Sequence, residues 1–399
     1  MVSLPDVGTL RLPGRIHFGY GSRAQLAEAV LVHGRKVFAV VDPFLVHSRF
    51  YGDILAGLRD AGIEVRIHSD ITPELPVGTL DEAGALARDY GPDVVVAIGG
   101  GSALDAAKLI ALLAVHPGPL SGYYGENLVP GPVLPIVALP TTAGTGSEVT
   151  PVAVVSDPDR ELKVGISSPF LVPAVAIVDP EFTVGSPAPV TAYSGIDALV
   201  HAVESYTARE FTLDWSLPLP VFTGRNALIE PIALQAARHL GPGLPVAVTK
   251  PDDRRAREEV AKGALLAGMA FGSTGTHLCH ALQYPIGALT KTPHGLGTGL
   301  MLPYVIDALN GDRLAALGAA LEGIPVREAS KERLRARVAE INRAIGVPSN
   351  LAGIGVTRDQ LPRIAELALG SKRLIAIAPI EPTRAALLDI LERAFEGAS

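Results

Sequence analysis

Five polar residues in the second half of the chain have types and spacing suited to metal chemistry. Asp197 and His201 stand four positions apart, so a helix would place them on one face. A helix cap for Asp197 and a local acceptor for His201 explain that pair equally well. His277, His280 and His294 add three imidazoles in or near apolar segments. Buried imidazoles need partners, and imidazoles with a carboxylate suit Zn²⁺ or Fe²⁺. The sequence therefore predicts a metal site, with His277 a ligand, a support for one, or a nucleotide contact.

A glycine turn in the first half has the chemistry of a phosphate cradle. The apolar run at 94–98 leads into Gly99-Gly100-Gly101-Ser102 and then into the helical pattern of 103–108. Glycines allow close approach of a ligand to the backbone, and the following helix offers unpaired N–H groups to a pyrophosphate. The alternative is a helix capping box formed by Ser102 and Asp105, which needs no ligand.

A second polar loop follows the apolar run at 133–139. It carries Thr141, Thr142, Thr145 and Ser147 together with two glycines, and such hydroxyls can bind ribose, phosphate or carboxamide groups. An ordinary Ser/Thr turn is the alternative.

Asp42 ends the β-rich run at 36–41. An acid there accepts hydrogen bonds from ribose hydroxyls and repels a 2′-phosphate, which favours NAD over NADP. Asp42-Pro43 is also a frequent start of a turn.

The elements that must position these residues differ between the two halves. In the first half, short apolar runs alternate with helical patterns, which is typical of an α/β domain whose parallel sheet is covered on both faces. Strands are predicted at 36–41, 62–68, 94–98, 133–139, 152–155 and 175–178, and helices at 25–32 and 80–90.

From about Thr191 the apolar spacing is helical. Helices are predicted over 254–271, 296–309, 331–345, 358–369 and 383–395, with an irregular insertion at 218–224. Gly185, Pro187 and Pro189 mark a boundary near 184–189.

Composition narrows the class of protein. A chain of 399 residues favours two domains, and a net charge of -7 without a basic stripe excludes nucleic acid as an expected partner. No apolar run has the length of a membrane span, and the N-terminal residues do not resemble a signal peptide. The single cysteine, Cys279, is expected to be a core thiol in a reducing, cytoplasmic environment. A charged fraction of only 19% favours a homodimer or higher homo-oligomer.

Four motifs in order then carry a resemblance over nearly the whole chain. GGGSALDAAK (99–108), PTTAGTGSEVT (140–150), GIDALVHAVESY (195–206) and HALQYPIGALTKTPHGLGTGLMLPY (280–304) resemble the iron-containing, group III alcohol dehydrogenases. The resemblance implies an α/β dinucleotide-binding domain with a parallel sheet at 1–186, an all-α metal-binding domain at 187–399, and an active site in the cleft between them. It implies hydride transfer between an alcohol, or an aldehyde or ketone in reverse, and NAD(H), with Fe²⁺ or Zn²⁺ as the metal.

The resemblance also assigns residues. It makes Asp197, His201, His280 and His294 the metal ligands. It puts Gly100, Gly101 and Ser102 on the pyrophosphate and Lys163 near the ribose. Asp42, Thr141, Thr142 and Thr145, with Asp105 and Ser147 from the same motifs, complete the expected cofactor site.

Two departures leave the reaction open. Many members carry a histidine for proton handling where this chain has Tyr284, and the segment 209–230 is longer than in simple alcohol dehydrogenases. Both features resemble the hydroxyacid-oxoacid transhydrogenase branch, for which Arg209, Arg225 and Lys291 are available as carboxylate anchors. Tyr284 and His277 are the expected catalytic residues for proton transfer, and a core tyrosine is the alternative for Tyr284.

Two further alternatives come from other classes of protein. One is a non-catalytic metal- or nucleotide-binding protein on the same scaffold, and the other is a lyase of the related dehydroquinate synthase scaffold. The intact set of expected ligands opposes the first alternative. The second would need a much more basic pocket than the sequence offers.

Overall fold

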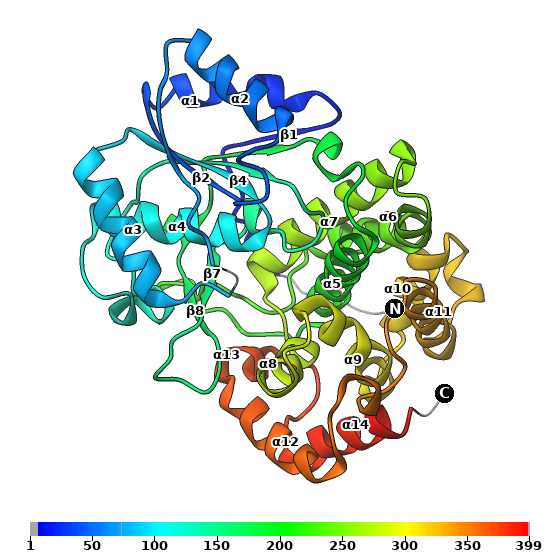
Figure 1. The fold of residues 1–399 in the computed structure, drawn as a ribbon. Coiled ribbons are helices and arrows are strands. Elements are labelled where there is room, and N and C mark those ends of the chain that lie inside the picture. Colours follow the sequence, from blue (N-terminus) through cyan, green and yellow to red (C-terminus); the bar gives the residue numbers. More distant parts are fainter. Residues whose placement is uncertain (1–6, 73, 398–399) are drawn as a thin grey trace. The chain divides into compact units, whose positions relative to one another are not determined.

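A six-stranded parallel sheet forms the core of the first of two units in the chain (Figure 1). The computed structural model describes residues 7–72 and 74–397. The strand order is β1 (Arg15–Phe18), β9 (Val175–Val178), β6 (Ile136–Pro140), β4 (Val94–Gly99), β2 (Lys36–Val41) and β3 (Glu64–His68). This sheet confirms the predicted α/β domain.

Apolar side chains alternate between the two faces of the sheet, and helices cover both faces. Phe38 and Val40 of β2 join one buried cluster with α3 (Val77–Tyr90) and α4 (Gly101–Val115). Val37 and Ala39 join the opposite cluster with α1 (Leu26–Leu31) and α2 (Arg49–Asp60). In Figure 1, α3 and α4 lie side by side. Burial on both faces explains the nearly continuous apolar runs in the sequence.

A second sheet, with three strands, is separate from the six-stranded parallel sheet. Its order is β5 (Gly125–Glu126), β8 (Val164–Ser167) and β7 (Val152–Val155), and β7 pairs antiparallel with β8. The strand predicted at 152–155 therefore exists, but it does not belong to the parallel sheet.

The second unit is built from helices over its described residues. Its α-helices are α5 (Ala188–Thr207), α6 (Glu230–Thr249), α7 (Arg254–Thr274), α8 (Leu278–Thr290), α9 (His294–Ala308), α10 (Arg313–Glu322), α11 (Lys331–Ala344), α12 (Leu361–Gly370), α13 (Lys372–Ile377) and α14 (Arg384–Glu396). None of the described helices is long and apolar enough to cross a membrane.

The boundary between the units differs from the predicted division in one respect. Contacts between residues group 11–183 as one unit. The chain passes into the second unit at 183/184, next to the boundary predicted near 184–189. The described N-terminal residues up to Leu10 group with the helical unit instead, because Ala227 N–H donates to the carbonyl of Val7 and Asn226 to that of Thr9. The assignment of residues 7–10 to the α/β domain is therefore corrected.

Glycines allow α5 and α9 to approach closely. A Cβ on Gly299 would lie 2.5 Å from Cγ1 of Ile196, and one on Gly295 would lie 1.9 Å from the carbonyl oxygen of Tyr193. Small residues at these points hold the start of α9 against the middle of α5, where Asp197 lies.

Replacing Gly299 with alanine should lower the free energy of unfolding by about 1–3 kcal/mol, because the added methyl group overpacks the contact with Ile196. Denaturant unfolding measures the change. Gly370 in α12 is the control, since nothing lies within 4 Å of its Cβ position; Gly370→Ala should change stability by less than about 0.5 kcal/mol. Equal effects of both variants would contradict the packing argument.

Candidate functional site

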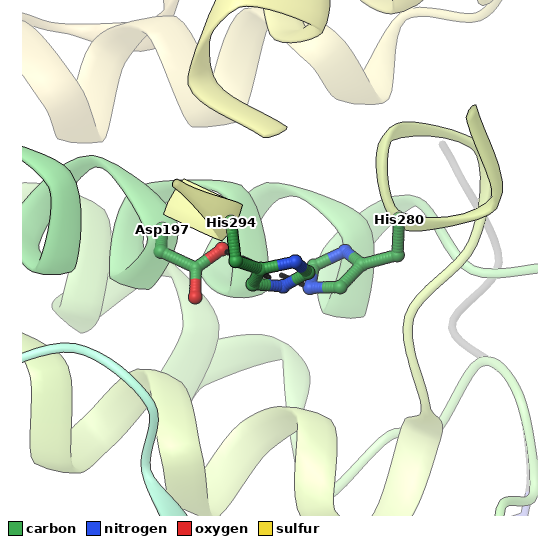
Figure 2. Close-up of side chains that lie close together, drawn as sticks. All are labelled: Asp197, His280 and His294. Atoms are coloured by element: carbon green, nitrogen blue, oxygen red, sulfur yellow. Dashed lines mark ion pairs between the residues drawn. The ribbon is translucent and has the colours of Figure 1, made fainter. Parts of the chain in front are cut away.

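Four side chains from three helices converge in the helical unit. Asp197 and His201 lie on α5, His280 lies on α8, and His294 is the first residue of α9. Figure 2 shows Asp197, His280 and His294 pointing toward one another, and their potential ligand atoms all lie within 4.8 Å. Oδ1 of Asp197 is 3.8 Å from Nε2 of His280 and 3.7 Å from Nε2 of His294.

His201 completes the group. Its Nε2 lies 3.1 Å from Nε2 of His280 and 3.8 Å from Oδ2 of Asp197. Its ring stacks on Phe271, with centroids 4.2 Å apart. The structure thus brings together all four residues that were predicted as metal ligands.

Hydrogen bonds on the far side of two imidazoles determine which nitrogen faces the cluster. Nδ1 of His280 donates to Glu204 at 2.7 Å, and Nδ1 of His294 donates to the amide oxygen of Gln283 at 2.6 Å. Each ring therefore keeps its lone pair on Nε2, the atom directed at Asp197. Thr298 donates to Oδ1 of Asp197 at 2.8 Å, which orients the carboxylate.

The electrostatics favour the protonation states that a metal requires. Burial lowers the pKa of His280 well below its usual range, and His201 lowers it further, so the ring is neutral. Burial raises the pKa of Asp197, but the three imidazoles outweigh burial and leave it below the usual range. Nδ1 of His201 is buried without a hydrogen-bond partner. A neutral His280 and two further imidazoles that face an ionised carboxylate are a donor set that fits a divalent cation.

The cap alternative for Asp197 is wrong. Helix α5 begins at Ala188, so Asp197 lies well inside it, and the hydroxyl of Ser194 donates to the carbonyl of Val190 instead.

His277 lies at the start of α8 and caps that helix. It is the N-cap of α8, where its Nδ1 accepts the Leu278 N–H at 2.7 Å and its Nε2 bonds Thr207 at 2.9 Å. Both ring nitrogens of His277 thus form hydrogen bonds, and its side chain is fully buried. These contacts are those of a helix cap, and a catalytic role for His277 stays a prediction.

Three supporting residues were not predicted from the sequence: Glu204, Gln283 and Thr298. Glu204 had a readable signal, since it continues the helical face of Asp197 and His201 by three residues. Gln283 fits because its neighbours Gly287 and Gly297 have no side chains; a Cβ at either would lie within 2.8 Å of it.

Cys279 and Tyr284 flank His280 on α8. Cys279 is buried and free, and burial together with Glu204 raises the pKa of its thiol well above the usual range, which confirms a core thiol. Tyr284 is half-buried, with its ring centroid 6.1 Å from that of His294. A role for Tyr284 in proton transfer stays a prediction.

The α/β unit contains the glycine turn that was predicted to be a phosphate cradle. Strand β4 ends at Gly99, and α4 begins at Gly101 with Gly100 as its N-cap and without a side-chain cap. The capping-box alternative is wrong: Ser102 lies inside the helix, and Asp105 accepts bonds from Ser147 at 2.6 Å and from the Val154 N–H at 2.9 Å. The first N–H groups of α4 are thus left without a side-chain cap.

The glycine turn and the threonine loop pack against each other. A Cβ on Gly101 would lie 2.7 Å from Cγ2 of Thr145, and one on Gly100 would lie 3.4 Å from Thr142. The Thr141 N–H donates to the carbonyl of Gly99. The two predicted loops therefore form one surface, and a side chain on Gly101 would displace the loop.

A buried lysine anchors the far end of the threonine loop. Nζ of Lys108 donates to the carbonyls of Thr150 and Val152, both at 2.8 Å. Burial lowers the pKa of Lys108 to about 8, and burial raises that of the nearby Glu148 to about 7. These hydrogen bonds hold the C-terminal end of the threonine loop in place.

Two further predicted cofactor residues lie in the same unit. Asp42 is half-buried, and its Oδ1 accepts a hydrogen bond from the Phe44 N–H at 3.0 Å. One of its two oxygens therefore stabilises a turn, as the alternative predicted. Lys163 forms an ion pair with Glu74 at 3.2 Å.

An α/β unit with a glycine turn at the start of α4, and a helical unit with a buried Asp–His cluster, agree with the class of protein that the four motifs predicted. Comparison with known families specifies it. The model of iron-containing alcohol dehydrogenases matches residues 13–180, and the C-terminal model of the Fe-containing alcohol dehydrogenase family matches residues 191–395. The chain belongs to the iron-containing alcohol dehydrogenase family, and it is an oxidoreductase, as the resemblance implied.

Individual relatives agree with this assignment. Long-chain-alcohol dehydrogenase 1 of Geobacillus thermodenitrificans (strain NG80-2) is 36% identical over 98% of both chains. The mitochondrial hydroxyacid-oxoacid transhydrogenase of Caenorhabditis elegans is 31% identical over 95% of this chain and 88% of its own. The crystal structure of sulfoacetaldehyde reductase from Bifidobacterium kashiwanohense in complex with NAD⁺ matches with a TM-score of 0.84 and 26% identity, over 98% of this chain and 99% of that one.

His277→Asn should keep kcat/KM within about tenfold of the wild type, because asparagine retains an acceptor at the N-cap of α8. His277→Ala should lower the free energy of unfolding by about 1 kcal/mol more than His277→Asn does, since it removes the cap. Steady-state kinetics with metal analysis, and denaturant unfolding, measure the two effects. A loss of kcat/KM beyond about 100-fold in His277→Asn with full metal content would show a catalytic role.

Proposed function

We propose that this protein is an NAD-dependent alcohol dehydrogenase of the iron type. It transfers a hydride between a small alcohol, or the corresponding aldehyde or ketone, and NAD(H). The observation that carries the proposal is the cluster of three imidazole Nε2 atoms around the Asp197 carboxylate. Fe²⁺ is the proposed metal, with Zn²⁺ as the alternative that has the same ligand preference.

A divalent cation at this cluster would supply a Lewis acid that polarises the substrate oxygen. The chain's own contribution is to hold Asp197, His201, His280 and His294 with their ligand atoms already aligned. Phe271 packs against His201 and keeps its ring in place. Tyr284, beside His294, is the proposed group for proton handling.

In the α/β unit, we propose that NAD lies across the glycine turn. Gly100, Gly101, Ser102 and the first N–H groups of α4 would take the pyrophosphate. Thr141, Thr142, Thr145 and Ser147 would line the cofactor, Asp42 would take the ribose hydroxyls, and Lys163 would lie near the ribose. Asp105 acts through Ser147, because its two oxygens are bonded to Ser147 and Val154. An active site in a cleft between the two domains stays a prediction.

No described contact favours the transhydrogenase alternative. Arg225 is paired with Glu230 at 2.8 Å and Glu210 at 3.3 Å, and Arg209 lies 4.0 Å from Glu381. Two of the three cations considered as carboxylate anchors therefore already face carboxylates.

A homo-oligomer and a cytoplasmic location are part of the same proposal. In the cytoplasm the free thiol of Cys279 would stay reduced.

His280→Ala should abolish metal retention and lower kcat/KM by at least about 1,000-fold, since a Lewis acid contributes several kcal/mol. Elemental analysis measures bound metal, and NADH absorbance with a panel of alcohols measures turnover with Fe²⁺ and Zn²⁺ supplied separately. The control is His239→Ala, because His239 pairs with Glu259 elsewhere in the helical unit. Full turnover in His280→Ala would refute the ligand assignment. Turnover of a hydroxyacid with an oxoacid without added NAD would instead show a transhydrogenase.

Asp42→Asn should shift the ratio of kcat/KM values for NADP and NAD toward NADP by about tenfold or more, which corresponds to about 1.4 kcal/mol. Asparagine keeps the acceptor for the Phe44 N–H, so the turn is preserved while the charge that repels a 2′-phosphate is lost. Asp53→Asn on the exposed side of α2 is the control. An unchanged ratio would show that Asp42 serves only the turn.

A further inference from the structure

Glu204 is a buried carboxylate without a cationic partner of its own. Its side chain has no exposed surface. Among the described residues, no lysine or arginine forms an ion pair with it; its neighbours are the rings of His277 and His280. A buried carboxylate is costly unless something compensates its charge.

Its contacts join α5 to the start of α8. Oε2 accepts the His277 N–H at 2.9 Å and Nδ1–H of His280 at 2.7 Å, and Oε1 accepts the Cys279 N–H at 2.6 Å. The positive end of a helix favours an anion, but this contribution amounts to about 2 kcal/mol at most. The helix end therefore compensates only part of the charge.

A charge count suggests what compensates the rest. The four proposed ligands carry one negative charge, because the three imidazoles are neutral ligands and only Asp197 is ionised. A divalent cation among them would leave one uncompensated positive charge in a buried site. Glu204, one hydrogen bond behind His280, brings the total to zero.

We infer that Glu204 is a positioning residue of the metal centre, which directs Nε2 of His280 at the cation and supplies the second negative charge that balances it. This inference rests on the proposed metal site. Partners that orient a histidine ligand in this way typically strengthen metal binding about 10–100-fold. If Glu204 only capped α8, its replacement would reduce stability and leave metal affinity unchanged.

The test is the dissociation constant for Zn²⁺, measured on the full chain by competition with a chromophoric chelator. Glu204→Gln keeps the size of the side chain and an acceptor oxygen but removes the charge. It should raise the dissociation constant about 10–100-fold. Glu230→Gln is the matched control: Glu230 is also buried in the helical unit, but it pairs with Arg225 and Arg313. That variant should stay within about threefold of the wild type.

Circular dichroism of the metal-free proteins checks that each variant is folded. If Glu204→Gln does not fold, Glu204→Asp replaces it, since a shorter side chain weakens the bond to His280; its dissociation constant should rise at least about threefold. An unchanged constant in the folded variant overturns the inference.

His280→Ala separates this failure from failure of the proposed function. If the wild type binds Zn²⁺ tightly and His280→Ala does not, an unchanged Glu204→Gln defeats only the role of Glu204. If His280→Ala binds as the wild type does, the metal site itself is refuted.

Discussion

The ionised carboxylate of Asp197 lies buried among three imidazoles. The neighbouring side chains of the helical unit stabilise this cluster through hydrogen bonds. A carboxylate removed from water requires compensation, and a neutral imidazole requires a partner on each nitrogen. The structure meets these needs on the far sides of His280 and His294, through Glu204 and Gln283. On the near side, the Nε2 atoms and the carboxylate oxygen face one another at 3.1–3.8 Å, so a shared cation would satisfy all of them.

Helix packing sets these distances. Gly295 and Gly299 let α9 lie directly on α5, and Gly287 and Gly297 leave room for Gln283. The same principle applies in the α/β unit, where Gly101 lets Thr145 approach the start of α4. In both units, glycines let two segments that are far apart in the sequence come into close contact.

The elements predicted well were those with one dominant signal. The strands at 36–41, 152–155 and 175–178 have their predicted bounds, because short β-branched runs with turn residues at their ends have few other solutions. Weak patterns were missed. Strand β1 (Arg15–Phe18) is only partly buried, and α6 contains Pro242 and Pro245 inside a helix, where proline normally argues against one. The antiparallel pairing of β7 was missed although it is local, with Val155 opposite Val164, because the short partner strand β8 was not predicted.

For the site, spacing and residue type pointed only to a metal site among five candidate residues. The family resemblance then singled out Asp197, His201, His280 and His294 as its ligands. The same reasoning did not predict that His277 caps α8, because an imidazole that caps a helix looks the same in the sequence as one that transfers a proton. It missed Glu204, whose importance depends on the start of α8 lying against α5.

The most direct test of the central claim is X-ray absorption spectroscopy of the wild-type protein loaded with one equivalent of Fe²⁺ under anaerobic conditions. The account predicts a site with three imidazole nitrogens and a carboxylate oxygen at about 2.0–2.2 Å, and a loss of the imidazole scattering pattern in His280→Ala. A spectrum of iron coordinated only by water and carboxylates, unchanged in that variant, would contradict it.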